Sequence, residues 1–193
     1  MTQLDPSLAA SLLRQALQQG QQPDVTVTSS SMSPLLQPGD QVRLEAVTQT
    51  ALQPGDIITF MSQGLINTHR YWGVLHENGP ERHLQTRGDR SLTFDQPVPA
   101  SNLIGRVILK RHRGRVLSFQ SGPGKWLNQH LAAVARLEGR WARPAAAAPR
   151  LTPVSLVPRL LHRSLLIWRT LLVTLITIRL PFDAPEQSPT AGA

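Results

Sequence analysis

Cysteine is absent from this chain of 193 residues. The absence excludes a disulfide framework, a thiolate metal site and a cysteine nucleophile. Aromatic residues make up only 5% of the sequence, which disfavours a stacking platform for single-stranded nucleic acid. Lysine is nearly absent too: the two lysines are Lys110 and Lys125, so no lysine precedes residue 110. The length suits one core-forming domain with appendages rather than two full domains.

Acidic residues are outnumbered, since 20 Lys and Arg stand against 12 Asp and Glu for a net charge of +8. Much of the arginine lies after residue 105. A basic C-terminal region is typical of a chain that contacts nucleic acid or anionic lipid, and equally of a solvated face.

A long apolar run is missing near the N-terminus. Residues 1–24 predict an amphipathic helix over 6–19 with a lead-in, too short and polar to span a bilayer and unlike a secretory signal. Residues 25–122 predict a β domain, because short alternating segments are separated by turn residues such as the hairpin pair Asn78-Gly79. We therefore expect a mostly β fold, a small barrel or folded β-ribbon, with an N-terminal helix and C-terminal amphipathic helices.

The C-terminal third predicts a helix over 123–142, an Ala/Pro/Arg linker over 143–158 and a disordered tail over 181–193. Residues 159–180 are long enough to span a bilayer, but Arg169 near the centre would cost roughly 2.5–3.5 kcal/mol there. An Arg/Thr stripe fits a helix lying in the membrane interface better. The alternatives are a spanning helix, a helix packed on the domain, or a β-branched strand. We expect association with a membrane surface or bilayer through this segment, on a side that the sequence leaves open.

Three segments carry the groups that nucleophilic catalysis requires. They are Ser29-Ser30-Ser31-Met32-Ser33-Pro34, then His69-Arg70, then Gly88-Asp89 with Asp95 six residues later. A serine hydroxyl needs an adjacent base, an imidazole titrates in the right range, and a carboxylate can fix its tautomer. The other histidines, His76, His83, His112, His130 and His162, show no ligand spacing, so we expect neither a metal nor a cofactor.

The order and spacing of these segments resemble the type I signal peptidases and their relatives, the LexA-type self-cleaving repressors. The resemblance covers roughly residues 25–109, with matching segments at 29–42, 52–60, 68–70, 84–95 and 103–107. It implies a serine endopeptidase that cleaves signal or leader peptides after a small residue, so the expected partner is a preprotein or leader-peptide substrate.

The resemblance assigns Ser31 as the nucleophile and His69 as the general base, in the place where most bacterial members have a lysine. The spacing from Gly88-Asp89 to Asp95 matches the histidine branch of the family. We expect Asp89 to orient His69, with Asp95 as the second choice.

The remaining assignments surround the nucleophile. The backbone N–H of Ser31 and the Ser29 hydroxyl are the expected oxyanion donors, and Met32 and Pro34 are expected in the substrate groove. Ser29 and Ser30 stand where the family usually has glycine, which permits backbone angles that serine tolerates poorly.

The alternative is a catalytically inactive or regulatory LexA-like relative that acts as a binding module. A LexA-type repressor needs a DNA-binding domain, and residues 1–24 are too short to hold a helix-turn-helix. The lysine base is missing as well. We therefore expect no specific nucleic acid partner.

Overall fold

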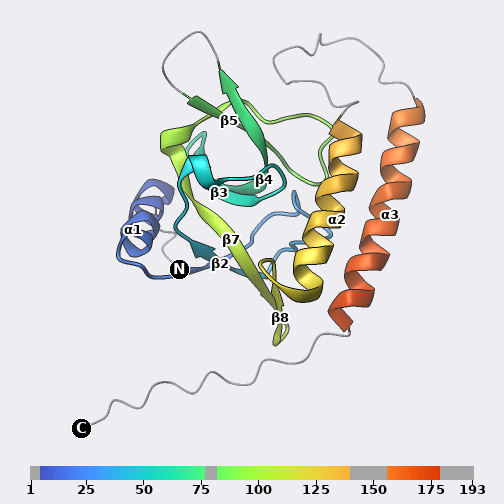
Figure 1. The fold of residues 1–193 in the computed structure, drawn as a ribbon, viewed down its shortest axis with the longest axis horizontal. Coiled ribbons are helices and arrows are strands. Elements are labelled where there is room, and N and C mark those ends of the chain that lie inside the picture. The colour runs from blue at the N-terminus through green and yellow to red at the C-terminus, as the bar shows by residue number, and fades with distance from the viewer. Residues whose placement is uncertain (1–4, 77–81, 140–155, 179–193) are drawn as a thin grey trace.

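The computed structural model describes residues 5–76, 82–139 and 156–178. An antiparallel sheet forms its centre, with one helix on one side and two helices on the other (Figure 1). The elements are α1 (Pro6–Gln18), β1 (Asp24–Thr26), β2 (Gln41–Glu45), β3 (Ile57–Ser62), β4 (Leu65–His76), β5 (Arg82–Arg87), β6 (Val98–Pro99), β7 (Leu103–His112), β8 (Arg115–Ser118), α2 (Gly122–Gly139) and α3 (Leu156–Ile178). Short 3-10 helices lie at Gln49–Ala51 and Ala100–Asn102.

The sheet has the strand order β1-β2-β7-β3-β4-β5-β6, and β8 also pairs with β7. Strand β7 is central: β2 pairs along one edge, while β3 and β8 pair with successive parts of the other. The prediction of a mostly β fold with N-terminal and C-terminal helices is confirmed. The prediction of a closed barrel is wrong. Among the described strands, the sheet ends at β1 and β6, which have three and two residues and do not pair with each other.

Two apolar clusters hold these elements together. The larger one joins Leu17 of α1, Val42 and Val107 of the sheet, Leu131 of α2 and Val173 of α3. The smaller one lies against β3 to β6 and contains Ile58, Phe60, Tyr71, Leu84 and Val98. Because the larger cluster takes side chains from all three helices, it fixes their positions relative to the sheet.

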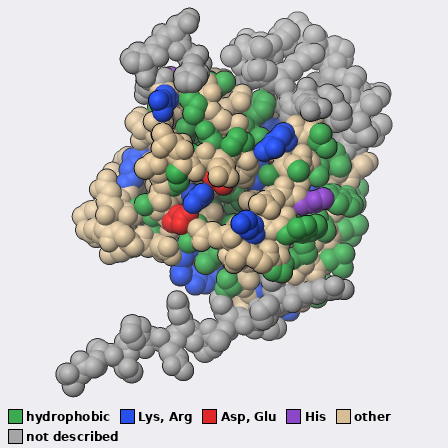
Figure 2. All heavy atoms as spheres, in the orientation of Figure 1, with side chains coloured by type: hydrophobic (Ala, Val, Ile, Leu, Met, Phe, Trp, Pro, Cys, Tyr) green, Lys and Arg blue, Asp and Glu red, His purple; other side chains and the backbone are tan. Residues whose placement is uncertain are grey.

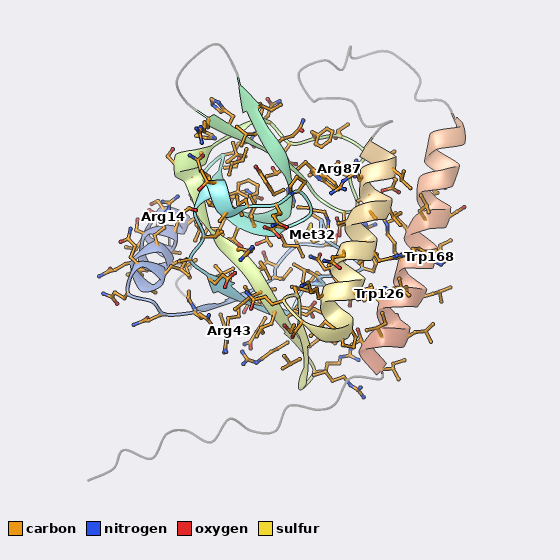
Figure 3. The ribbon with its side chains drawn as sticks, viewed as in Figure 1. Arg14, Met32, Arg43, Arg87, Trp126 and Trp168 are labelled. Atoms are coloured by element: carbon orange, nitrogen blue, oxygen red, sulfur yellow. The ribbon has the colours of Figure 1, made fainter. Side chains whose placement is uncertain are left out.

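Helices α2 and α3 pack side by side (Figure 1). His130 lies between Trp126 of α2 and Trp168 of α3, with its ring centroid 5.0 Å from each (Figure 3). No helix within the described ranges is both long enough and apolar enough to cross a membrane. The predicted turn at Asn78-Gly79 and the predicted tail over 181–193 lie outside the described residues, as does the predicted linker except for its last three residues, which begin α3.

Candidate active site

The segment that carries Ser31 is anchored by its own apolar residues. Ser31 follows β1 in a turn, and the next residue, Met32, is buried together with Leu35 and Leu36. Figure 3 shows Met32 in the interior of the molecule. Two backbone bonds close the turn, from Ser33 N to the Ser30 carbonyl and from Leu36 N to the Met32 carbonyl, both 3.0 Å. Burial of these side chains leaves the serine hydroxyls at the surface of a fixed turn.

The Ser31 hydroxyl lies 3.1 Å from that of Ser29. No hydrogen bond joins Ser31 to His69 among the described contacts. The next hydroxyl, that of Ser30, accepts a hydrogen bond of 3.3 Å from Arg90. Neither Ser29 nor Ser30 has a positive φ, so these serines occupy the usual glycine places without the backbone conformation that would strain them.

His69 lies on β4 opposite Ile58 of β3, and its Nδ1 is 2.7 Å from Asp95 Oδ2. This bond favours the tautomer in which Nδ1–H donates to the carboxylate and Nε2 is left as the acceptor. The Nε2 atom faces the nucleophile across Gly88. A Cβ at residue 88 would lie 3.3 Å from both His69 Nε2 and Ser31 Cβ, so the base and the nucleophile flank the same glycine.

Asp95, rather than Asp89, orients the imidazole, and the predicted order of the two carboxylates is wrong. Asp95 is held in turn by Thr86, whose hydroxyl donates to Asp95 Oδ2 over 2.7 Å. The Asp89 carboxylate accepts two bonds from Arg70, of 2.9 and 2.8 Å, and both side chains are buried. His69 and Arg70 are successive residues of a strand, so they point to opposite faces and meet different carboxylates.

A groove of about 370 Å³ adjoins Ser31. Residues 25–29 and 65–68 line it, and α1 adds Pro6 and Ala9. None of the described residues that line this groove carries a charged side chain, and its apolar residues include Val25, Val27, Met32, Leu36 and Ile66. The expectation for Met32 therefore agrees with its position, whereas Pro34 is buried and does not line the groove.

A buried charge network behind the site was missed by the sequence analysis. Its members are Arg70, Arg87, Asp89, Glu138 and Arg169, each at most 4% exposed. Burial lowers the pKa of the Arg87 guanidinium, an effect that Glu138 and Asp89 oppose. The available signal was Arg169 in the middle of the apolar part of the 159–180 segment, since burying an arginine there is costly unless an acidic residue faces it.

Among the described residues, no three His, Asp or Glu side chains lie together as a metal site requires. No protein-family model matches this chain, and no curated protein matches it either. The geometry of Ser31, His69 and Asp95 is therefore the main indication of what this chain does.

Proposed function

We propose that this chain is a serine endopeptidase of the signal-peptidase type, which cleaves an extended peptide after a small residue. The observation that carries the proposal is the hydrogen bond between His69 and Asp95, together with Gly88, where an added Cβ would meet both His69 Nε2 and Ser31. A histidine held in one tautomer beside an accessible serine is the arrangement that activates a hydroxyl nucleophile.

In the proposed reaction the Ser31 hydroxyl turns from Ser29 toward His69 Nε2, a rotation about one side-chain bond. Oγ attacks the scissile carbonyl as Nε2 takes its proton, and Asp95 stabilises the imidazolium. The same proton then passes to the leaving amine as the C–N bond breaks. Water, deprotonated by His69, hydrolyses the acyl-serine. Once Ser31 has turned away, the Ser29 hydroxyl is free to donate to the oxyanion, a contact worth about 3 kcal/mol in the transition state.

The groove supports an extended substrate. Val27 exchanges backbone bonds with Gly39 and Asp40 on the β2 side, so by antiparallel alternation the polar backbone groups of Thr26 and Thr28 face the groove. Across the groove, β4 pairs with β5 only from Arg70 onward. A peptide strand can therefore add to the edge of β1, and the uncharged lining favours apolar side chains near the cleaved bond.

The test is cleavage of preproteins and of peptides with an Ala-X-Ala end, followed by mass spectrometry. Ser31→Ala and His69→Ala should abolish cleavage, whereas Ser33→Ala should retain it as the matched serine control. Unchanged cleavage in either of the first two variants would reject the proposal.

The alternative is a binding module that takes up the same extended peptide without cutting it. The observation in its favour is the present bond of the Ser31 hydroxyl to Ser29 rather than to His69. Fluorescence anisotropy with a labelled peptide distinguishes the two functions. The alternative predicts saturable binding to wild type and Ser31→Ala alike, with no product on prolonged incubation, whereas the peptidase predicts product with wild type alone.

We also propose that the protein associates with anionic membrane surfaces through α2 and α3. Apolar side chains gather on this side of the molecule (Figure 2). The exposed ones are Trp126 and Leu137 of α2 and Ile167, Trp168, Leu171, Leu175 and Ile178 of α3. Between residues 96 and 182 the sequence has a single carboxylate side chain, Glu138, which is buried. An exposed apolar face in a stretch of sequence where basic residues far outnumber acidic ones suits an anionic bilayer surface.

Cosedimentation with vesicles tests this association. Binding to phosphatidylglycerol-containing vesicles should fall at least tenfold in the double variant Leu171→Ser and Leu175→Ser. The matched control is Leu8→Ser with Leu12→Ser, two leucines of α1 that are each 50% exposed. If the α3 variant binds vesicles like wild type, this face does not dock on membranes. If wild type dimerises through the face instead, analytical ultracentrifugation would detect it and the membrane proposal fails.

A further inference from the structure

The loop over 88–91 packs against the backbone of Ser31. Gly88 approaches so closely that a Cβ there would lie 2.9 Å from the Ser31 carbonyl oxygen. Two residues on, Arg90 N donates to that same oxygen over 3.0 Å, and Ser91 N closes the loop on the Gly88 carbonyl. The backbone of Ser31, and with it the place of its N–H, therefore depends on where this loop lies.

Residues of β4 and of both C-terminal helices hold this loop. The Asp89 carboxylate accepts two hydrogen bonds from Arg70, which also donates to the side chain of Asn128 on α2 over 2.7 Å. The Asp89 carbonyl accepts a bond of 3.2 Å from Arg169 of α3. Arg169 in turn donates to Glu138 of α2 over 2.6 Å. One guanidinium thus connects the loop over Ser31 to both C-terminal helices.

The buried ion pair between Arg169 and Glu138 is not readily explained by a contribution to stability alone. Arg169 and Glu138 are 1% and 2% exposed, and the Nε of Arg169 has no partner within the described part of the chain. A buried ion pair of this kind is often no more stabilising than apolar residues of the same volume. The other described residues of α3 that pack on the core, Leu172, Val173 and Ile176, are apolar, and a methionine or leucine at 169 would serve packing equally well.

We propose that Arg169 is a positioning residue for the reaction at Ser31, and that α3 acts as a brace for the loop over 88–91. The inference rests on the proposed peptidase function. Arg169 does not touch the reacting groups: it fixes the Asp89 carbonyl, and through Gly88 and Arg90 it fixes the backbone of Ser31. Loss of the brace lets the nucleophile move relative to His69, and small displacements of this kind reduce rate much more than binding.

The experiment compares Arg169→Met, Arg169→Lys and, as the matched control, Arg163→Met, which removes an exposed arginine from the same helix. Steady-state peptide cleavage gives kcat and KM. Amide hydrogen exchange at Arg90 reports the loop independently of activity. We expect Arg169→Met to lower kcat about tenfold to a hundredfold with KM within twofold of wild type, and to speed exchange at Arg90 but not in β7. Arg169→Lys should fall between, because lysine keeps the charge but not the two-sided fork.

Several outcomes would overturn the brace. One is wild-type exchange at Arg90 in Arg169→Met, and another is faster exchange throughout β7, which would indicate a general loss of packing. Faster exchange at Arg90 with unchanged kcat would remove the positioning role. Should Arg169→Met not fold, Glu138→Gln and Arg169→Lys carry the same comparison. If wild type cleaves no peptide, the peptidase proposal fails by itself, while the exchange at Arg90 still decides whether α3 holds the loop.

Discussion

Asp89 and Asp95 have different partners and therefore different expected costs of substitution. Asp95→Asn removes the charge that holds the His69 tautomer, so kcat should fall by a factor on the order of 10⁴ while the fold persists. Asp89→Asn leaves Arg70 buried without its counter-charge and should lower the free energy of unfolding by about 3–5 kcal/mol. Peptide cleavage and urea denaturation of both variants check this division. A stable Asp89→Asn beside an unfolded Asp95→Asn would reverse it.

Gly88 is the residue whose side chain has no room. In Gly88→Ala the new Cβ would meet the Ser31 carbonyl oxygen at 2.9 Å and His69 Nε2 at 3.3 Å, so the nucleophile or the base must shift. We expect at least a tenfold loss of kcat and a lower melting temperature as well, because the oxygen that the Cβ meets belongs to the backbone. Gly64→Asn is the control, since it lies in an open turn with φ of +73° that asparagine tolerates. Full activity in Gly88→Ala would show that the loop over 88–91 can move to accommodate the methyl group without displacing Ser31 or His69.

Lys110 lies behind the Ser31 turn, where its Nζ donates to the Leu35 carbonyl over 2.7 Å. Burial lowers the pKa of its ammonium group below the ordinary 10.5, and Asp40 offsets this only in part. At a pH between the lowered pKa of the folded state and the ordinary pKa of the unfolded state, the unfolded chain binds this proton more than the folded chain does. The free energy of unfolding therefore rises with pH in that range. Urea denaturation from pH 7 to 10 should show that the free energy of unfolding of wild type, relative to that of Lys110→Met, increases as the pH rises. Parallel curves would contradict it.

Among the elements, α1 connects the core to the groove. Leu17 is buried in the larger cluster, and Pro6 and Ala9 of the same helix line the groove. Leu17→Ala should cost about 2–5 kcal/mol in the free energy of unfolding and raise KM, because the wall of the groove loosens. The control Leu12→Ala, at a half-exposed position, should change stability by no more than about 0.5 kcal/mol. An unchanged KM in Leu17→Ala would show that α1 does not shape the groove.

Local pattern predicted the elements better than their assembly. Apolar spacing over 6–19 and 159–180 indicated the helices that the structure has at Pro6–Gln18 and Leu156–Ile178. Strand spacing, however, does not determine whether a sheet closes, because closure depends on the length and register of its outermost strands. Alternation along β4 separates His69 from Arg70, but only the path of the loop over 88–95 decides which carboxylate each one meets. The partner of Arg169 was equally hidden, since Glu138 lies 31 residues away.

At the scale of the whole molecule, charge and apolar surface act together. The net charge of +8 should make vesicle binding depend on salt, because screening shortens from about 8 Å at physiological ionic strength to 3 Å at 1 M. We expect binding to anionic vesicles to weaken several-fold between these conditions and to persist in part through the exposed leucines and isoleucines of α3. Cosedimentation across a salt series measures this. Complete loss at 1 M salt would assign the binding to charge alone.

The contact between Arg169 and Asp89 joins residues 80 positions apart, and this separation has a consequence for biosynthesis. At roughly 5–20 residues per second, a ribosome adds Arg169 about 4 to 16 seconds after Asp89. The serine, the histidine and both carboxylates have by then left the ribosome without their brace. On the proposal above, the nascent chain remains a poor peptidase until α3 has been made and has packed, so chains without α3 are spared cleavage by their own newly made domain.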